Sequence, residues 1–189
     1  MPHKFITEKI SLLLKTKERV VVAIDGRCAS GKSTLAERLK QQLLCNVFHM
    51  DDFFLRPEQR TEERLSEPGG NVDRERFMEE VLQPLIEGKT FSYRPYICKT
   101  SSFCVPVTVN PHRINIIEGS YSCHPDLWNF YDLHIFLDVQ KDIQLERILK
   151  RNGKEKLEIF KTQWIPLEEK YFKAYDIENK CEITYNTNF

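Results

Sequence analysis

The sequence lacks the features that mark several large classes of protein. No apolar run approaches the roughly 20 residues that a membrane-spanning helix needs. The 28 Lys and Arg residues are balanced by 28 Asp and Glu residues, so the formal net charge is zero and no overall basic character favours nucleic acid. Internal repeats and low-complexity tracts are also absent. We therefore expect neither a membrane nor a nucleic acid polymer as a partner.

Disulfide patterning is missing as well. Six cysteines are present, but none forms a C-x-x-C pair and no signal-peptide pattern precedes them. This usage favours reduced thiols in the cytoplasm over a disulfide framework. With 189 residues, 41% of them hydrophobic, the chain can bury one good core. We expect a single domain over residues 1–189, and the oligomeric state stays open, a homo-oligomer included.

A phosphate-binding loop is the strongest motif present. Residues 26–33 read Gly-Arg-Cys-Ala-Ser-Gly-Lys-Ser, which is a complete G-x-x-x-x-G-K-[ST] pattern. A β-branched run at residues 19–24 predicts a buried strand before it, and apolar residues at helical spacing predict a helix over residues 34–44 after it. Such a loop belongs between a strand and a helix. The sequence therefore predicts a nucleotide-binding protein.

The loop residues expected to contact the nucleotide are Gly26, Ala29, Ser30, Gly31, Lys32, Ser33 and Thr34. The two glycines let the backbone wrap so that its N–H groups surround phosphate oxygens. Lys32 places a positive charge near the β- and γ-phosphates, and the Ser33 hydroxyl is a ligand for the Mg²⁺ that bridges them. We therefore expect ATP as the donor and Mg²⁺ as the metal.

Strands and helices alternate along the chain. Short apolar runs predict further strands at residues 47–50, 114–117, 133–137 and 181–185. Apolar spacing predicts helices at residues 5–15, 74–86, 141–151 and 157–175. This alternation predicts an α/β fold, namely a three-layer P-loop domain with a mostly parallel central sheet flanked by helices and a small lid. The polar stretch over residues 56–71 is expected to be a mobile loop.

Acidic residues follow the predicted strands. Asp51 comes after the second strand and Glu118 after the third. Ligands bind at the carboxyl ends of parallel strands, so these side chains are expected to share one site. Phosphoryl transfer to a hydroxyl needs an acid beside Mg²⁺ and a carboxylate that orients the acceptor and takes its proton. We assign the first task to Glu118 and the second to Asp51.

Two arginines are candidates for closing over the transferred phosphoryl group. Arg147 and Arg151 lie four residues apart, on one face of the helix predicted after the fourth strand. Charge spreads over the equatorial oxygens during transfer, and cations stabilise it. Residues 147–160 are therefore the expected lid. The alternative is a solvated basic face, which Lys150 and Lys154 favour.

In their order along the chain, these motifs resemble the uridine kinase-like branch of the P-loop small-molecule kinases, which includes phosphoribulokinase and pantothenate kinase. The resemblance covers about residues 20–175. Besides the phosphate loop, its anchors are Met50-Asp51-Asp52-Phe53-Phe54, Asn71-Val72-Asp73, Tyr96 and Ile116-Ile117-Glu118-Gly119. It implies ATP- and Mg²⁺-dependent phosphorylation of a hydroxyl group on a small molecule, with uridine or cytidine as the acceptor.

The resemblance also implies roles for individual residues. Asp51 matches a catalytic base, Asp73 a carboxylate that grips ribose hydroxyls, and Tyr96 a contact with the nucleoside; Arg94 is assigned to the same acceptor site, and Glu118 matches the acid beside Mg²⁺. Two structural alternatives stay open. Asp73 precedes a predicted helix and suits an N-cap, and Tyr96 suits one face of a short strand.

Other functions stay open as well. The acceptor loop, at about residues 52–73, and its neighbourhood hold Arg56, Arg60, Arg64, Arg74 and Arg76, which would suit a nucleoside monophosphate. A non-nucleoside alcohol is a further alternative, because Ile97 and Ser101 stand where the family has residues that contact the base. A protein of another class, a non-catalytic nucleotide-dependent switch, would bind nucleotide without acceptor-dependent turnover.

Overall fold

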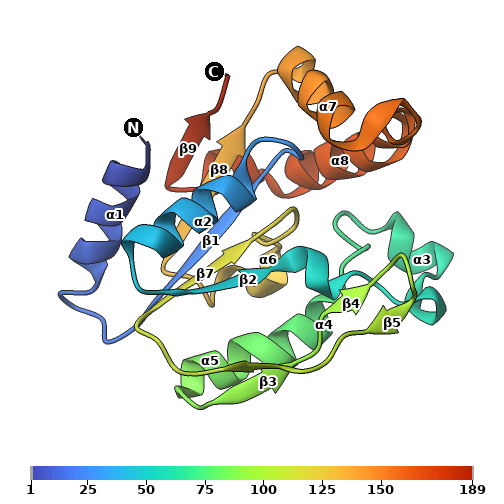
Figure 1. Ribbon diagram of the computed structural model, residues 1–189. Helices are drawn as coiled ribbons and strands as arrows, with labels where there is room; N and C mark the ends of the chain where they lie inside the picture. Colours follow the sequence, from blue (N-terminus) through green and yellow to red (C-terminus); the bar gives the residue numbers. More distant parts are fainter. Residues whose placement is uncertain (1, 189) are drawn as a thin grey trace.

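A single parallel sheet forms the centre of the computed structural model, which describes residues 2–188 (Figure 1). Its strands are β1 (Val20–Gly26), β2 (Asn46–His49), β7 (Ile114–Glu118), β8 (Leu133–Asp138) and β9 (Ile183–Asn186). They lie in the order β2-β7-β1-β8-β9, and every neighbouring pair is parallel. The five predicted strands are thus confirmed, including the C-terminal one, which pairs with β8.

Alternate side chains of the strands enter two apolar layers. Val20, Val22 and Ile24 of β1 pack with α1 (Pro2–Leu13) and α2 (Lys32–Gln42). Val21 and Ala23 belong to the opposite layer. That layer also contains residues of α4 (Arg74–Phe77), α5 (Gln83–Glu87), α6 (Pro125–Trp128), α8 (Ile165–Tyr175) and α9 (Ile177–Lys180). Each fully buried aliphatic side chain contributes about 1.5–3 kcal/mol. Helices on both faces give the three-layer α/β architecture that the sequence predicts.

The predicted long helices are present with modified geometry. Residues 74–86 form a continuous run of α4, the π-helical segment η3 (Met78–Leu82) and α5. The helix after β8 is α7 (Lys141–Ile159), which has a non-helical residue, Gly153 at φ 81° and ψ 173°. A second π-helical segment, η4 (Phe160–Trp164), connects α7 to α8. None of the helices within residues 2–188 has the length and apolar character needed to cross a membrane.

Four short strands lie outside the central sheet, and sequence analysis considered only the stretch that contains Tyr96 as a possible strand. β3 (Phe91–Tyr93) pairs antiparallel with β6 (Val107–Val109), and β4 (Tyr96–Ile97) with β5 (Ser102–Phe103). Strands of two or three residues are too short for a period of two to become visible.

The stretch over residues 56–71, expected to be a mobile loop, contains the short helices η2 (Pro57–Gln59) and α3 (Glu62–Ser66). The Arg64 guanidinium explains this order, because it donates to the carbonyl oxygens of Gly70 and Val72, both at 2.9 Å, and pairs with Glu75 at 2.7 Å. The turn η1 (Met50–Phe53) precedes the stretch. The acceptor loop, at about residues 52–73, is therefore a folded segment with short helices and not the irregular loop that the sequence led us to expect.

Gly26 ends β1 and pairs with Leu137 of β8, and its φ is 134°. A Cβ at this position would lie 2.1 Å from the Leu137 carbonyl oxygen. We expect Gly26→Ala to lower the free energy of unfolding by more than about 3 kcal/mol, measured by chemical denaturation. Gly31→Ala is the control, because Gly31 has φ 96° with open space around it, and its cost should be about 1–2 kcal/mol. Equal losses in the two variants would contradict the steric explanation.

Candidate active site

The P-loop joins β1 to α2 at the carboxyl edge of the sheet (Figure 1). Gly31 caps α2 in a left-handed conformation, so the helix begins at Lys32. The buried Lys32 side chain curls back over the loop, and its ammonium donates to the carbonyl oxygens of Gly26 at 2.6 Å and Arg27 at 2.9 Å. The loop thus holds a positive charge at the start of α2, where backbone N–H groups already favour anions.

The structure brings Ser33 and Glu118 together. Glu118 ends β7, and the parallel register pairs it with Ile24 of β1, two residues before the P-loop begins at Gly26. The Ser33 hydroxyl donates to Glu118 Oε2 at 3.2 Å. The other carboxylate oxygen lies 2.6 Å from His49 Nδ1. Sequence analysis missed His49, although its place at the end of β2, beside β7, was available as a signal.

Asp51 lies in the η1 turn that follows β2. It is exposed to solvent at a cavity. Partial desolvation by the surrounding protein raises the pKa of its carboxyl above the usual range. The charges of Lys32, Glu118 and His49 are also close enough to affect this pKa; the Lys32 charge opposes the effect of desolvation and Glu118 adds to it. The pKa of His49 is raised chiefly by its hydrogen bond to Glu118. A carboxylate with a raised pKa is a better proton acceptor, which suits a base for a hydroxyl group.

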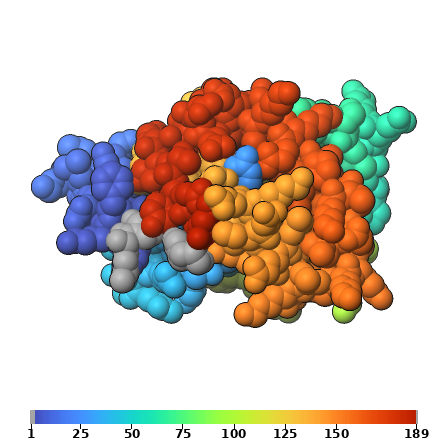
Figure 2. Space-filling view, turned by 90° about the horizontal axis from the view of Figure 1, so that it is seen from above, coloured from blue at the N-terminus to red at the C-terminus, as the bar shows by residue number. Residues whose placement is uncertain are grey.

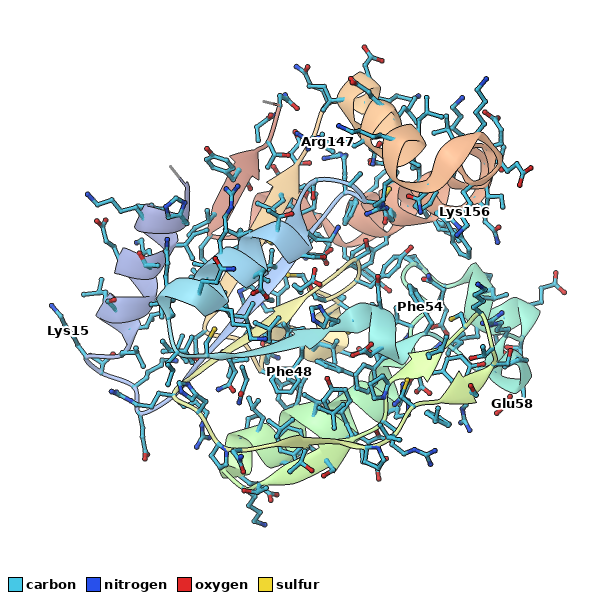
Figure 3. All side chains as sticks on the ribbon, in the orientation of Figure 1. Lys15, Phe48, Phe54, Glu58, Arg147 and Lys156 are labelled. Atoms are coloured by element: carbon cyan, nitrogen blue, oxygen red, sulfur yellow. The ribbon has the colours of Figure 1, made fainter. Side chains whose placement is uncertain are left out.

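Lys32, Ser33, Asp51 and Glu118 line one cavity of about 1130 Å³, and His49 lies outside its lining. Its walls come from the P-loop, α2, the segment after η1, the loop after β7, and α7 to α8. Phe54 and Arg147 lie on opposite sides of it (Figure 3). In the view from above, α7 and the C-terminal segment lie over the P-loop, whose blue surface shows only between them (Figure 2). The cavity is therefore partly covered by the expected lid.

Arg147 and Arg151 both line this cavity, as their spacing led us to expect. Their partners differ. The Arg147 guanidinium donates to the carbonyl oxygens of Ala29 at 3.2 Å and Thr187 at 2.6 Å, which fixes α7 against the P-loop and the C-terminal segment. Arg151 donates to Asn152 Oδ1 at 2.8 Å and lies over the Phe160 ring. Their expected contact with a phosphoryl group stays a prediction.

Three predicted acceptor residues lie outside the cavity lining. Asp73 is buried and caps α4, since it accepts from the Arg76 backbone N–H at 3.2 Å and from Gln59 Nε2 at 2.8 Å. Tyr96 is buried in β4 with its ring 5.4 Å from that of Phe103. Arg94 donates to the Cys104 carbonyl oxygen at 3.2 Å. The N-cap and short-strand alternatives are confirmed, and contact of these three residues with an acceptor stays a prediction.

Sequence analysis missed a connection between α8 and the P-loop. Glu168 is buried and accepts from the Cys28 backbone N–H at 2.9 Å and from the Ser120 hydroxyl at 2.7 Å. Glu169 forms an ion pair of 2.7 Å with Arg27. The contacts with the P-loop join residues about 140 positions apart, and Ser120 lies 48 positions from Glu168, so local patterns contain no sign of them. They hold the outer side of the P-loop to the helix that follows the lid.

Asp25 is a second anchor that the sequence did not reveal. Its fully buried carboxylate accepts from the backbone N–H groups of Gly26, Tyr121 and Cys123 at 2.7, 3.2 and 2.9 Å and from the Tyr171 hydroxyl at 2.9 Å. Burial raises the pKa of Asp25 to about 6, although these hydrogen bonds and the Lys32 charge favour the ionised form. Asp25 thus ties the start of the P-loop to the loop after β7.

The donor set suits a magnesium ion that is shared with a nucleotide. Ser33 and Glu118 supply a hydroxyl and a carboxylate side by side, and Mg²⁺ is commonly held by one or two such oxygens together with substrate phosphates and water. Within residues 2–188 no three His, Cys, Asp or Glu side chains are arranged to hold a metal by themselves. The buried Ser30 hydroxyl has no hydrogen-bond partner among residues 2–188. The P-loop therefore has one more group that can form a hydrogen bond with a ligand.

The parallel sheet, the P-loop after its first strand and the acids at its carboxyl edge define the chain as an α/β P-loop protein of the kinase type. The profile of the phosphoribulokinase / uridine kinase family matches residues 21–171, and the chain belongs to this family.

Individual relatives are similar at modest identity. The chain is 28% identical over 155 residues to the uridine kinase of Aliivibrio salmonicida, which covers 72% of this chain and 69% of that protein. It is 30% identical over 149 residues to tRNA-specific adenosine deaminase subunit tad2 of Schizosaccharomyces pombe, covering 75% of this chain. The chain spans only 36% of that relative's length.

Solved structures share the fold. A possible uridine kinase from Bacillus stearothermophilus matches with a TM-score of 0.69 and 21% identity, covering 95% of this chain and 98% of that one. YFH7 from Saccharomyces cerevisiae, a putative P-loop kinase, matches with a TM-score of 0.70 and 13% identity, covering 99% of both chains. At these identities the likeness concerns the fold alone.

Proposed function

We propose that this protein transfers the γ-phosphoryl group of Mg-ATP to a hydroxyl group of a small molecule. The observation that carries the proposal is the opening of Lys32, Ser33, Glu118 and Asp51 on one cavity. A phosphate-binding cation, two oxygen ligands for a metal and a carboxylate base are the groups that such a transfer requires.

In this proposal the chain's own residues hold the two substrates in position and stabilise the charge on the transferred phosphoryl group. P-loop N–H groups and Lys32 hold the β- and γ-phosphates, and Ser33 and Glu118 hold Mg²⁺, which neutralises phosphate charge when bound. Asp51 accepts a hydrogen bond from the acceptor hydroxyl and takes its proton as the new P–O bond forms, while the bond between the γ-phosphorus and the β–γ bridging oxygen breaks and ADP leaves. Arg147 and Arg151, from α7, stabilise the charge on the transferred group.

A nucleoside, uridine or cytidine, is the acceptor that the names of the relatives suggest. A non-nucleoside alcohol is the second candidate, and one observation favours it. Asp73 and Tyr96, which match the family's contacts to the ribose and the nucleoside, lie outside the cavity lining, and Asp73 is already engaged in capping α4. The catalytic end of the cavity is compatible with both acceptors, since each presents a hydroxyl to Asp51.

The test is acceptor-dependent ADP production from Mg-ATP, with the product identified by mass. The panel contains uridine, cytidine, their monophosphates, neutral alcohols and anionic alcohols. We expect turnover with a member that carries a free hydroxyl, and none without Mg²⁺. Nucleotide binding without turnover on any member would favour a nucleotide-dependent switch, and the absence of nucleotide binding would overturn the proposal.

A further inference from the structure

The acceptor loop and the start of α4 contain five arginines, Arg56, Arg60, Arg64, Arg74 and Arg76. Four of them pair with carboxylates: Arg56 with Glu58, Arg64 with Glu75, Arg74 with Asp126, and Arg76 with Glu80. Across residues 2–188, no carboxylate forms an ion pair with Arg60. Arg60 is also the one member of this set that lines the cavity. The fold thus neutralises the structural arginines and leaves a cation at the cavity wall.

Arg60 is held in place by neutral groups. Its Nε and Nη2 atoms donate to the Leu55 carbonyl oxygen at 3.1 and 2.9 Å, and Nη2 lies 3.9 Å from Cys98 Sγ. The guanidinium has five N–H donors, so these contacts leave donors for a ligand. Two hydrogen bonds to one carbonyl oxygen also fix the orientation of the group, which lowers the entropy lost when an anion binds.

Arg60 lies in the same part of the cavity as the proposed base. Cys98 lines the cavity and contacts Arg60, and the charge of Asp51 also acts on the Cys98 thiol. The wall beside them is mostly apolar, with Phe54, Leu55 and Leu65. One small molecule can therefore present a hydroxyl to Asp51 and an anionic group to Arg60.

We propose that Arg60 binds a carboxylate or phosphate group of the acceptor, so that the acceptor is a small anionic alcohol. The proposal rests on the proposed function, since it concerns the second substrate of the same site. Arginine matches the geometry of both anions through paired N–H donors. It also accounts for Arg60 being the one of the five arginines that both lines the cavity and forms no ion pair with a carboxylate among residues 2–188, since an anionic group on the acceptor would pair with it.

Anion binding with the donor site filled is the first arm of the test. Isothermal titration calorimetry follows the binding of Mg-AMPPNP, and then of inorganic phosphate or acetate to the resulting complex. We expect at least one anion to bind saturably, and Arg60→Gln to weaken this binding about 10- to 100-fold. Arg56→Gln is the matched control, because Arg56 lies in the same loop, pairs with Glu58 and is outside the cavity lining.

A third variant separates the effect of the positive charge at position 60 from the effect of the guanidinium geometry. Arg60→Lys keeps the cation but loses the paired contact with Leu55, so it should retain more anion affinity than Arg60→Gln. Selective binding of phosphate indicates a phosphorylated alcohol, and selective binding of acetate a hydroxy acid. No saturable binding of either anion, or equal binding in the wild type and Arg60→Gln, would overturn the proposal. Failure of Mg-AMPPNP to bind would instead reject the proposed function.

Turnover is the second arm. In matched pairs of alcohols, such as ribose and ribose 5-phosphate or glycerol and glycerate, the second member has an anionic group in place of one hydroxyl and keeps the other hydroxyls. We expect the anionic member to have the higher kcat/KM, and Arg60→Gln to remove that preference by raising KM. Turnover confined to neutral nucleosides would overturn the assignment of Arg60 while leaving the proposed function intact.

Discussion

Lys32→Ala is expected to lower kcat about 10³-fold or more while the protein stays folded. The fold places the Lys32 ammonium at the P-loop. This cation should stabilise the negative charge that develops on the transferred phosphoryl group. Its loss removes two hydrogen bonds from a charged donor to the carbonyl oxygens of Gly26 and Arg27, which cost about 1.5–3 kcal/mol each. Thermal unfolding separates this structural cost from the loss of transition-state stabilisation.

Steady-state kinetics and thermal unfolding of the same preparations measure this effect. Lys40→Ala is the matched control, because Lys40 is an exposed lysine in the last turn of the same helix and lies outside the cavity lining. It should retain near-normal kcat. Normal turnover in a folded Lys32→Ala protein would show that the P-loop lysine has no part in the reaction.

The central strands were predictable from the sequence because they are buried on both faces. Val20 to Ile24 is an apolar run, and Leu133 to Leu137 is apolar apart from His134, as parallel strands between two helical layers require. The same topology explains why the site could be located, since the carboxyl ends of β1, β2 and β7 meet at one edge of the sheet. Ser33, Asp51 and Glu118 were predictable because each follows a recognisable element.

Contacts between distant parts of the chain were not predictable. The anchoring of the P-loop by Glu168 and Glu169 depends on how α8 packs, and no periodicity in residues 157–175 distinguishes these glutamates from those of a solvated face. Asp73 illustrates the opposite problem. A carboxylate before a helix suits both a cap and a ligand, and the packing of Gln59 and Arg76 around it is visible only in three dimensions.

Arg60 combines both difficulties. The sequence identifies five arginines near the acceptor loop, but it cannot tell which have carboxylate partners. The partners come from several segments, and Asp126 lies 52 residues from Arg74. The three-dimensional pairing thus reduces five equivalent candidates to one cation on the cavity wall.

Asp51→Asn is expected to lower kcat about 10²- to 10⁴-fold while Mg-ATP binding changes little. Asparagine is close to aspartate in size but cannot take the proton of the acceptor hydroxyl. Asp51 interacts electrostatically with Lys32 and Glu118, which belong to the proposed donor site. The substitution therefore also removes a negative charge from the neighbourhood of the bound nucleotide. That change should leave the affinity for an anionic nucleotide equal or slightly higher.

The comparison of binding with turnover identifies the role of Asp51. Calorimetry with Mg-AMPPNP gives the nucleotide affinity, and rapid-quench single-turnover measurements give the rate of transfer. Asp52→Asn is the matched control, since Asp52 is the neighbouring carboxylate in η1 but lies outside the cavity lining and interacts with Tyr93. A general base predicts loss of transfer alone, because ground-state binding of the nucleotide does not involve the acceptor proton. Equal losses of affinity and rate would instead make Asp51 a metal ligand or a structural residue, and the base would have to be sought elsewhere on the cavity wall.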